Sequence, residues 1–198
     1  MRGVALSLVA VAAALALGAV ALVRPASAPA EEGAATASAQ QQAVARRLAA
    51  ATAARQIRSI DRYRKQTWSY QRLMRRPLTR STNSAQRSPD PEYRRWVLTL
   101  WRTRAAAARR QAHNPPRKAA WNCIHRHEGA WNDPHAPYYG GLQMDIHFQR
   151  LYGPELLRRK GTADNWTAVE QMWVAERAYR SGRGFYPWPN TARACGLI

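Results

Sequence analysis

Apolar residues in the first half of the chain recur with the spacing of helices. From Ala43 to about Arg76 they fall three or four positions apart on an alanine- and arginine-rich background, without glycine or proline before Pro77. This stretch predicts one long helix. Residues 31–42 are small and polar and predict a linker. Residues 75–91 (RRPLTRSTNSAQRSPDP) mix prolines with small polar residues and predict a loop.

A second helix is predicted to begin at Asp90. Its side chain can cap the helix, Pro91 suits the first helical position, and Glu92 favours the positive end of the helix dipole. The apolar residues that follow form one helical stripe, which we expect to pack against another helix rather than on a membrane surface. The stripe consists of Tyr93, Trp96, Val97, Leu100, Trp101 and Ala105.

The last third of the chain predicts short helices joined by tight turns. Residues 118–128 have helical spacing and should end near Gly129, and the NDPHAP that follows is turn material. Residues 138–144 (YYGGLQM) predict a tight turn or a short hairpin. Asp145 can cap a helix that ends at Gly153.

Thr167 and Glu170 have the spacing of a capping box, so another helix should follow them. Because no segment shows the alternation of a long strand, we expect a mainly α protein in three parts. These are a signal peptide or membrane anchor at 1–30, a linker and basic helical region at 31–118, and a small domain at 119–198.

The N-terminus has the composition of an export signal. Arg2 precedes an uncharged apolar run from Gly3 to Val23, and an Ala-x-Ala site ends at Ala28 or Ala30. The run is also long enough to span a bilayer as an uncleaved anchor. The pattern therefore predicts an extracytoplasmic protein that is either secreted or held by an N-terminal helix.

Positive charge is concentrated in the middle of the chain. The formal net charge is +19, and residues 41–120 hold 20 Lys and Arg against three acids, whereas residues 121–198 hold 9 against 7. A basic region predicts an anionic partner. For an exported protein, anionic wall polymer or lipid headgroups fit better than nucleic acid, which we do not expect as a partner.

The chain has two cysteines, Cys123 and Cys195. Export to an oxidising compartment predicts that they form a disulfide. In the chain-entropy model such a bond stabilises the fold by about 4 kcal/mol. It would also hold the C-terminal tail against the segment that carries Glu128.

Residues 121–144 (WNCIHRHEGAWNDPHAPYYGGLQM) contain the candidate chemistry. Two histidines beside a glutamate suggest a metal site, but a zinc-binding helix places its histidines four residues apart on one face. His125 and His127 are two apart and point to different sides of a helix, and Trp131 stands where the second ligand would be. We therefore expect no metal or other cofactor, and a different role for Glu128.

Glu128 lies among residues typical of a carbohydrate cleft. Beside apolar neighbours its carboxyl would keep a proton near neutral pH, as the acid of a glycosidase must. Five tryptophans and five tyrosines occur in residues 121–198, and flat rings bind the faces of sugars. Trp121, Trp166 and Trp173 are expected in the core. The expected exposed platform rings lie beside turns and are Trp131, Tyr138, Tyr139 and Trp188.

Three blocks in this region resemble the transglycosylase-like domain of resuscitation-promoting factors. They are the seven-residue spacing from Trp121 to Glu128, the YYGGLQ block and EQMWVAER, and the likeness spans about residues 121–196. The resemblance implies a small lysozyme-like fold, secretion and cleavage of peptidoglycan, with Glu128 as the catalytic acid. The residues that it places in the substrate groove are Tyr138, Tyr139, Gly140, Gly141, Leu142 and Gln143.

The number of carboxyl groups bears on the mechanism. Asp133 is the nearest second acid, but its NDP context is typical of a turn. We therefore expect that Glu128 alone protonates the glycosidic oxygen and then acts as a base while the sugar's 6-hydroxyl attacks, giving a 1,6-anhydro product. Two alternatives are a catalytically silent wall-binding module and a membrane-tethered basic protein that binds anionic polymer through residues 43–118. We expect a monomer.

Overall fold

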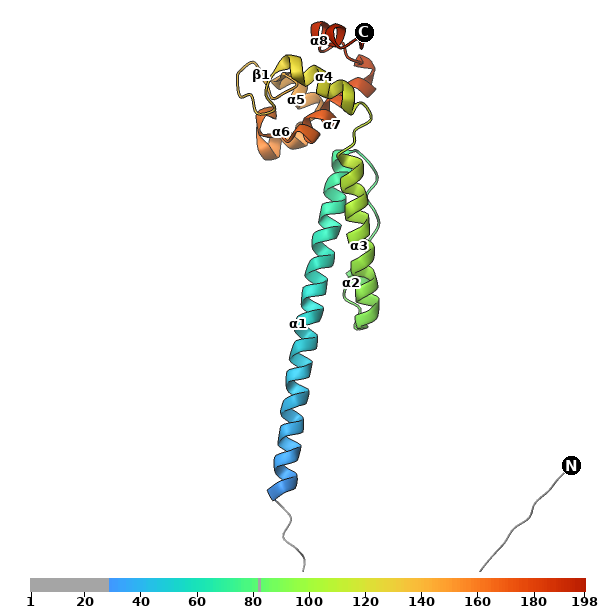
Figure 1. Ribbon diagram of the computed structural model, residues 1–198, viewed down its shortest axis with the longest axis vertical. Coiled ribbons are helices and arrows are strands. Elements are labelled where there is room, and N and C mark those ends of the chain that lie inside the picture. The colour runs from blue at the N-terminus through green and yellow to red at the C-terminus, as the bar shows by residue number, and fades with distance from the viewer. Residues whose placement is uncertain (1–28, 82) are drawn as a thin grey trace, which may run out of the picture. The chain divides into compact units, whose positions relative to one another are not determined.

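The computed structural model describes residues 29–81 and 83–198, and helices dominate them, as the spacing of apolar residues predicts (Figure 1). The predicted signal or anchor run at residues 3–23 lies outside the described residues. Within the described residues, no helix is both long enough and apolar enough to cross a membrane. The first three helices are α1 (Pro29–Leu73), the short α2 (Asn83–Gln86) and α3 (Pro91–Ala112).

Helix α1 begins earlier than predicted, because residues 31–42 are helical and not a linker. That prediction was wrong because alanine, glutamate and glutamine are strong helix formers, and together they outweigh the single glycine in the segment. The helix ends at Leu73. Beyond it, Arg75 has a φ of 51° and the Arg76 N–H donates to the carbonyl of Gln71 at 2.8 Å, which closes the last turn.

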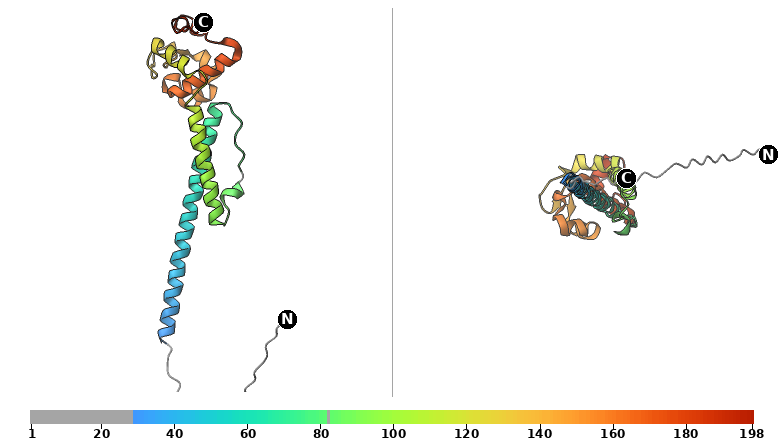
Figure 2. Two further views of the ribbon diagram at one scale, coloured as in Figure 1. Left: turned by 45° about the vertical axis from the view of Figure 1, so that its right-hand side comes forward. Right: turned by 90° about the horizontal axis from the view of Figure 1, so that it is seen from below.

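Residues 48–198 form one compact unit, and the part of α1 before Leu48 belongs to a separate one. Within the larger unit, α3 lies beside α1 (Figures 1 and 2). Ile60 of α1 is buried against Val97 and Trp101 of α3, so the central part of the predicted stripe packs on another helix as expected. At the start of α3, however, Trp96 is 57% exposed. We call α3 and residues 48–73 of α1 the helical pair.

Residues 118–198 form a second group of helices, which we call the C-terminal bundle. Two short strands pair antiparallel, with Tyr138 opposite Asp145 and Tyr139 opposite Met144, and they form the short hairpin that YYGGLQM predicts. The elements are α4 (Lys118–Glu128), β1 (Tyr138–Tyr139), β2 (Met144–Asp145), α5 (Ile146–Tyr152), α6 (Pro154–Lys160), a 3-10 turn η1 (Ala163–Asn165), α7 (Ala168–Ala178), a wide turn η2 (Tyr179–Arg183) and α8 (Pro189–Ala194).

Local caps begin the helices where the sequence predicts them. Asp90 accepts a hydrogen bond from the Glu92 N–H at the start of α3. Asp145 accepts one from the Phe148 N–H at the start of α5. Thr167 caps α7 in a complete capping box with a glutamate three positions later. These three predicted helix starts are confirmed.

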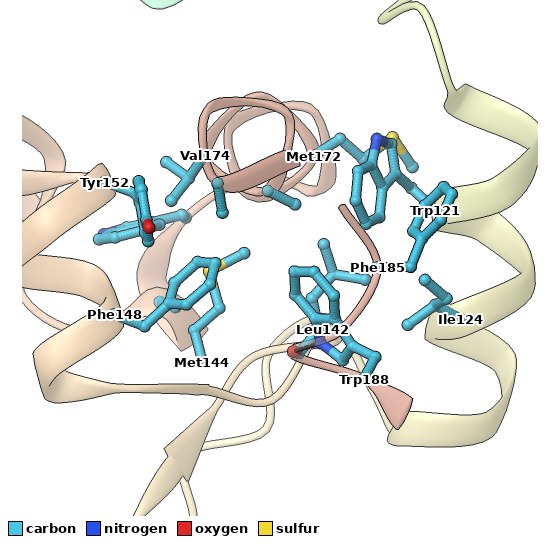
Figure 3. Packing of buried hydrophobic residues seen from close by; sticks show 14 of the residues in the cluster. Trp121, Ile124, Leu142, Met144, Phe148, Tyr152, Met172, Val174, Phe185 and Trp188 are labelled. Atoms are coloured by element: carbon cyan, nitrogen blue, oxygen red, sulfur yellow. Dashed lines mark hydrogen bonds between the residues drawn. The ribbon is translucent and has the colours of Figure 1, made fainter. Parts of the chain in front are cut away.

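One apolar core fills the C-terminal bundle (Figure 3). Trp121 and Ile124 of α4 approach it from one side and Phe148 of α5 from the other, and Val174 of α7 is buried in the same core. Trp121 and Ile124 have no exposed surface. This packing fixes the direction of α4, which carries Glu128 at its end.

A smaller cluster joins the helical pair to the bundle. The ring of Trp173 from α7 is buried beside Met74 and Ala112, and its Nε1 donates to the carbonyl of Ala112 at 2.7 Å. The Arg177 guanidinium donates to the carbonyls of Tyr152 and Leu73, both at 2.7 Å. Burial lowers the pKa of Arg177 to about 10, so the group still carries its charge at neutral pH.

Candidate active site

Glu128 is the last residue of α4, and the helix stops there for a local reason. Gly129 has a φ of 152° and a ψ of −172°, in a region that favours glycine, and its N–H closes the final turn on the carbonyl of His125 at 3.2 Å. The carboxyl of Glu128 is half-buried. The helix end therefore holds this side chain at the border between the packed core and solvent.

Thr191 contacts the carboxyl directly. Its Oγ1 donates to Oε1 of Glu128 at 2.7 Å and lies 3.3 Å from the carbonyl of Trp188. The other carboxyl oxygen, Oε2, has no hydrogen-bond partner among the described residues. One oxygen is thus oriented by the protein, and the other is available to a ligand.

The predicted disulfide between Cys123 and Cys195 is confirmed, with Cα atoms 6.1 Å apart. Cys123 lies in α4 before Glu128, and Cys195 follows α8, which carries Thr191. The bond therefore joins the two helices that bring Glu128 and Thr191 together. Closing a loop over a sequence separation of 72 corresponds to about 4 kcal/mol of stabilisation in the chain-entropy model.

Asp133 and Gln143 lie beside Gly129, the residue that follows Glu128. A Cβ built on Gly129 would lie 3.4 Å from Asp133 Oδ2 and 3.4 Å from Gln143 Nε2. Gln143 Nε2 donates to Asp133 Oδ2 at 2.9 Å and to the carbonyl of Gly140 at 3.0 Å. The predicted groove residue Gln143 therefore lies beside the residue that follows the candidate acid, and its hydrogen bonds to Asp133 and Gly140 hold its side chain in place.

Asp133 has the turn role that its NDP context predicts. Its Oδ1 accepts hydrogen bonds from the imidazole and the backbone N–H of His135, and these bonds hold the pKa of the Asp133 carboxyl below its ordinary value. The carboxylate is therefore ionised at neutral pH. It orients Gln143 and is not placed as a second proton donor.

Trp131 is half-buried, and its ring stacks on the ring of His125 with centroids 4.0 Å apart and planes 20° from parallel. Gly141 permits this stack, because a Cβ there would approach His125 Nδ1 to 2.6 Å and the Trp131 ring to 2.8 Å. The carbonyl of Trp131 accepts a hydrogen bond from Gln171 Nε2 at 2.7 Å. Gly141, a predicted groove residue, is buried and shapes the site from beneath.

The four predicted platform rings differ in exposure. Tyr138 is 50% exposed, and Tyr139 is half-buried against the core. The expected exposure is wrong for Trp188, which is 4% exposed and donates from Nε1 to the carbonyl of Leu142 at 2.6 Å. The ring is buried because the disulfide-linked tail folds back over the core, where Trp188 packs on Trp121. Trp188 therefore supports the groove turn through the backbone and offers no open face.

Two residues that the sequence reasoning did not single out shape the site. Thr191 orients the candidate acid, and it lies four positions before the paired Cys195, a spacing that points it toward α4. Gln171 is fully buried and fixes the Trp131 carbonyl. Gln171 belongs to the EQMWVAER block, so the resemblance includes this segment but assigns no role to Gln171.

The described residues contain one group that could hold a metal ion, formed by Cys123, His127 and Cys195. Both cysteines are joined in the disulfide, which removes the two thiolates that such a site would need. The one fully buried acid among the described residues, Glu176, accepts hydrogen bonds from Trp121 Nε1 at 2.8 Å and from the backbone and guanidinium of Arg117. Its partners satisfy it, which indicates a structural role.

The arrangement therefore offers one carboxyl oxygen at the end of α4 for proton transfer. A half-buried acid has one oriented and one available oxygen, with an ionised carboxylate and an amide near its backbone. The likeness to the transglycosylase-like domain depends on the short blocks quoted above. Comparison with family models, with curated proteins and with solved structures finds no match to this chain.

Proposed function

We propose that the C-terminal bundle cleaves glycosidic bonds in peptidoglycan glycan strands, with Glu128 as general acid and then general base, in an exported protein with a lysozyme-like fold. The observation that carries this proposal is the Glu128 carboxyl, half-buried, with Oε1 bound by Thr191 and Oε2 available. An acid at a helix end whose following residue, Gly129, lies beside Gln143 of the short β hairpin supports the lysozyme-like interpretation.

In the first step, Glu128 donates its proton to the glycosidic oxygen, and the bond from that oxygen to the anomeric carbon breaks. The sugar's 6-hydroxyl then attacks the anomeric carbon and gives its proton to the Glu128 carboxylate. The product has a 1,6-anhydro ring, and the acid is regenerated without water. This route needs one acid, which is consistent with the turn role of Asp133.

Thr191 suits both stages of this reaction. A hydroxyl donates one hydrogen and accepts at its lone pairs. Beside the ionised carboxylate, Oγ1 donates to Oε1 at 2.7 Å. Beside the protonated acid it can accept from Glu128 and donate instead to the carbonyl of Trp188, 3.3 Å away. The same side chain therefore orients the acid before and after proton transfer.

Replacement of the acid by its amide tests the proposal. The full chain, its Glu128→Gln variant and a Glu92→Gln control are incubated with purified peptidoglycan. Glu92 is an exposed acid at the start of α3, outside the site. We expect wild type and control to release soluble muropeptides and Glu128→Gln to lose at least about 100-fold in rate, the lower range for a general acid. Unchanged circular dichroism shows that the fold persists.

Mass spectrometry of the products separates the mechanisms. Anhydro ends support attack by the 6-hydroxyl, whereas reducing ends alone would replace it with hydrolysis, for which Asp133 is the first residue to test. Binding of peptidoglycan by the wild type without any turnover would favour a silent wall-binding module. Full activity in Glu128→Gln would remove Glu128 from the mechanism.

A further inference from the structure

Arginines and alanines share one face of α3. The residues recur three or four positions apart and border a hollow of about 580 Å³ between α3 and α1, whose far wall includes Tyr63 and Gln66. Ala105 is buried beneath this face, and the exposed side chains of the three arginines border the hollow. The residues of α3 and its C-terminus on this face are Arg102, Ala105, Ala106, Arg109, Arg110 and His113.

A second hollow, of about 450 Å³, shares Arg110 and Asn114 with the first. Its walls add Arg75 and Arg76 from the turn after α1, and Arg180 from the bundle. The turn holds the two arginines in place through backbone hydrogen bonds of 3.0 and 2.8 Å to α1. We call the two adjoining hollows the arginine groove.

The arginine groove is not neutralised by the described residues. No carboxylate lines either hollow in the described chain, although six arginines do. The ion pairs of the described residues leave out Arg102, Arg109 and Arg110, and Arg180 makes one long contact of 3.6 Å with an acid. Like charges held together repel one another, and a bound polyanion relieves this repulsion.

We propose that the arginine groove binds a linear polymer that carries phosphate groups. The planar guanidinium fork suits the bidentate binding of phosphate oxygens, and two hollows in series offer successive positions to a repeating chain. On the same walls, the exposed Gln111 amide accepts a hydrogen bond from Arg76 at 2.6 Å through Oε1, which leaves its Nε2 as an uncharged donor.

A lipid surface fits this groove less well. Membrane-surface helices place large apolar side chains next to their cations. In the described part of the chain, none of the large exposed apolar residues lines either hollow, and the exposed pair of Tyr93 and Trp96 lies at the other end of α3. The polymer is therefore the occupant that the charges and walls favour.

Binding of inorganic polyphosphate to the full chain tests the proposal, and the measurement does not depend on Glu128. The groove variant is Arg102→Gln, Arg109→Gln and Arg110→Gln, which keeps helix propensity nearly constant. The matched control changes three exposed arginines outside both hollows to Gln: Arg47, Arg58 and Arg95. Both variants lose three charges. Fluorescence anisotropy of labelled polyphosphate over a salt series gives affinity and its salt dependence.

We expect the groove variant to bind on the order of tenfold or more weakly, and the slope of log affinity against log salt to fall by roughly 2 for three lost phosphate contacts. The control should retain both values closely. Equal losses in the two variants would indicate diffuse attraction to the net charge and overturn the proposal. Competition by monomeric phosphate at equal phosphorus concentration would also overturn it, because the site would then bind free phosphate and not a chain.

Binding to vesicles of phosphatidylglycerol tests whether the arginine groove recognises lipid headgroups instead. The N-terminal apolar run is present in every variant, so only the difference between wild type and groove variant bears on the groove. We expect that difference to be small on vesicles and large on polyphosphate. The reverse pattern would assign the arginine groove to lipid headgroups and reject the polymer.

Discussion

At the scale of single residues, the proposed reaction depends most on the contact between Thr191 and Glu128. A half-buried carboxyl can rotate, and a rotated acid loses the alignment that proton transfer needs. The 2.7 Å hydrogen bond from Thr191 Oγ1 limits this rotation. Thr191 is therefore a positioning residue, whose loss should affect turnover more than substrate binding.

Thr191→Val keeps the size and branching of the side chain and removes only the hydroxyl. One hydrogen bond to a charged group is worth about 1.5 kcal/mol or more, so we expect kcat to fall roughly tenfold while KM stays close to that of the wild type. Steady-state kinetics on soluble glycan fragments measure both values. Thr191→Ser should restore most of the rate. A change confined to KM, or no rescue by serine, would contradict the positioning role.

At the scale of elements, α7 shows how a local cap and a tertiary ion pair combine. Glu170 Oε2 accepts a hydrogen bond from the Thr167 N–H at 2.8 Å and contacts Lys160 Nζ at 2.7 Å. Burial opposes the charge on Glu170, but the bonds to Lys160 and Thr167 outweigh it and keep the pKa of Glu170 below its ordinary value. The charged form is therefore favoured by folding.

Because that pKa is lowered, the contribution of Glu170 to stability is present above the unfolded pKa of about 4.3 and is lost as the pH falls through the folded value. Glu170→Gln keeps a capping side chain but loses the charge. We expect it to lower the free energy of unfolding by about 0.5–1 kcal/mol at pH 7, and by progressively less below pH 4. Urea unfolding at several pH values measures this difference. An equal loss at pH 7 and pH 3 would show that charge is not its cause.

Sequence patterns predicted these elements where the signal is local. The caps at Asp90, Asp145 and Thr167 each bind a backbone N–H within three residues, so a short window contains both partners. Trp188 was misjudged because its burial depends on the tail folding over the core, and Thr191 was missed because its partner is 63 positions away in the sequence. The candidate acid was found from its neighbours, but its orientation depends on tertiary structure.

At the scale of the whole molecule, the excess positive charge and the candidate catalytic residue lie in different parts of the chain. Cations without carboxylate partners gather on the helical pair, whereas the bundle, which carries Glu128, is close to neutral. The two parts nevertheless share buried surface. Trp173 of the bundle is 4% exposed and packs on Met74 and Ala112. The bundle taken alone would therefore expose one of its tryptophans.

Residues 114–198 expressed alone test how far the bundle depends on the helical pair. They keep the disulfide, the core and Glu128, so we expect them to fold and to cleave glycan. They lose the contacts of Trp173 and the hydrogen bond from Arg177 to Leu73. We expect this loss to lower the free energy of unfolding by on the order of 2–4 kcal/mol. For a domain of this size that loss should lower the Tm by about 10 °C or more.

Tryptophan fluorescence identifies the source of the loss. Emission from residues 114–198 should lie to the red of emission from the same fragment with Trp173→Gln, because Trp173 meets water there, and the substitution should restore part of the Tm. A fragment as stable as the full chain would show that the buried contact contributes nothing. A folded fragment without cleavage would mean that the helical pair acts on the site itself, since each residue argued to orient Glu128 is present in the fragment.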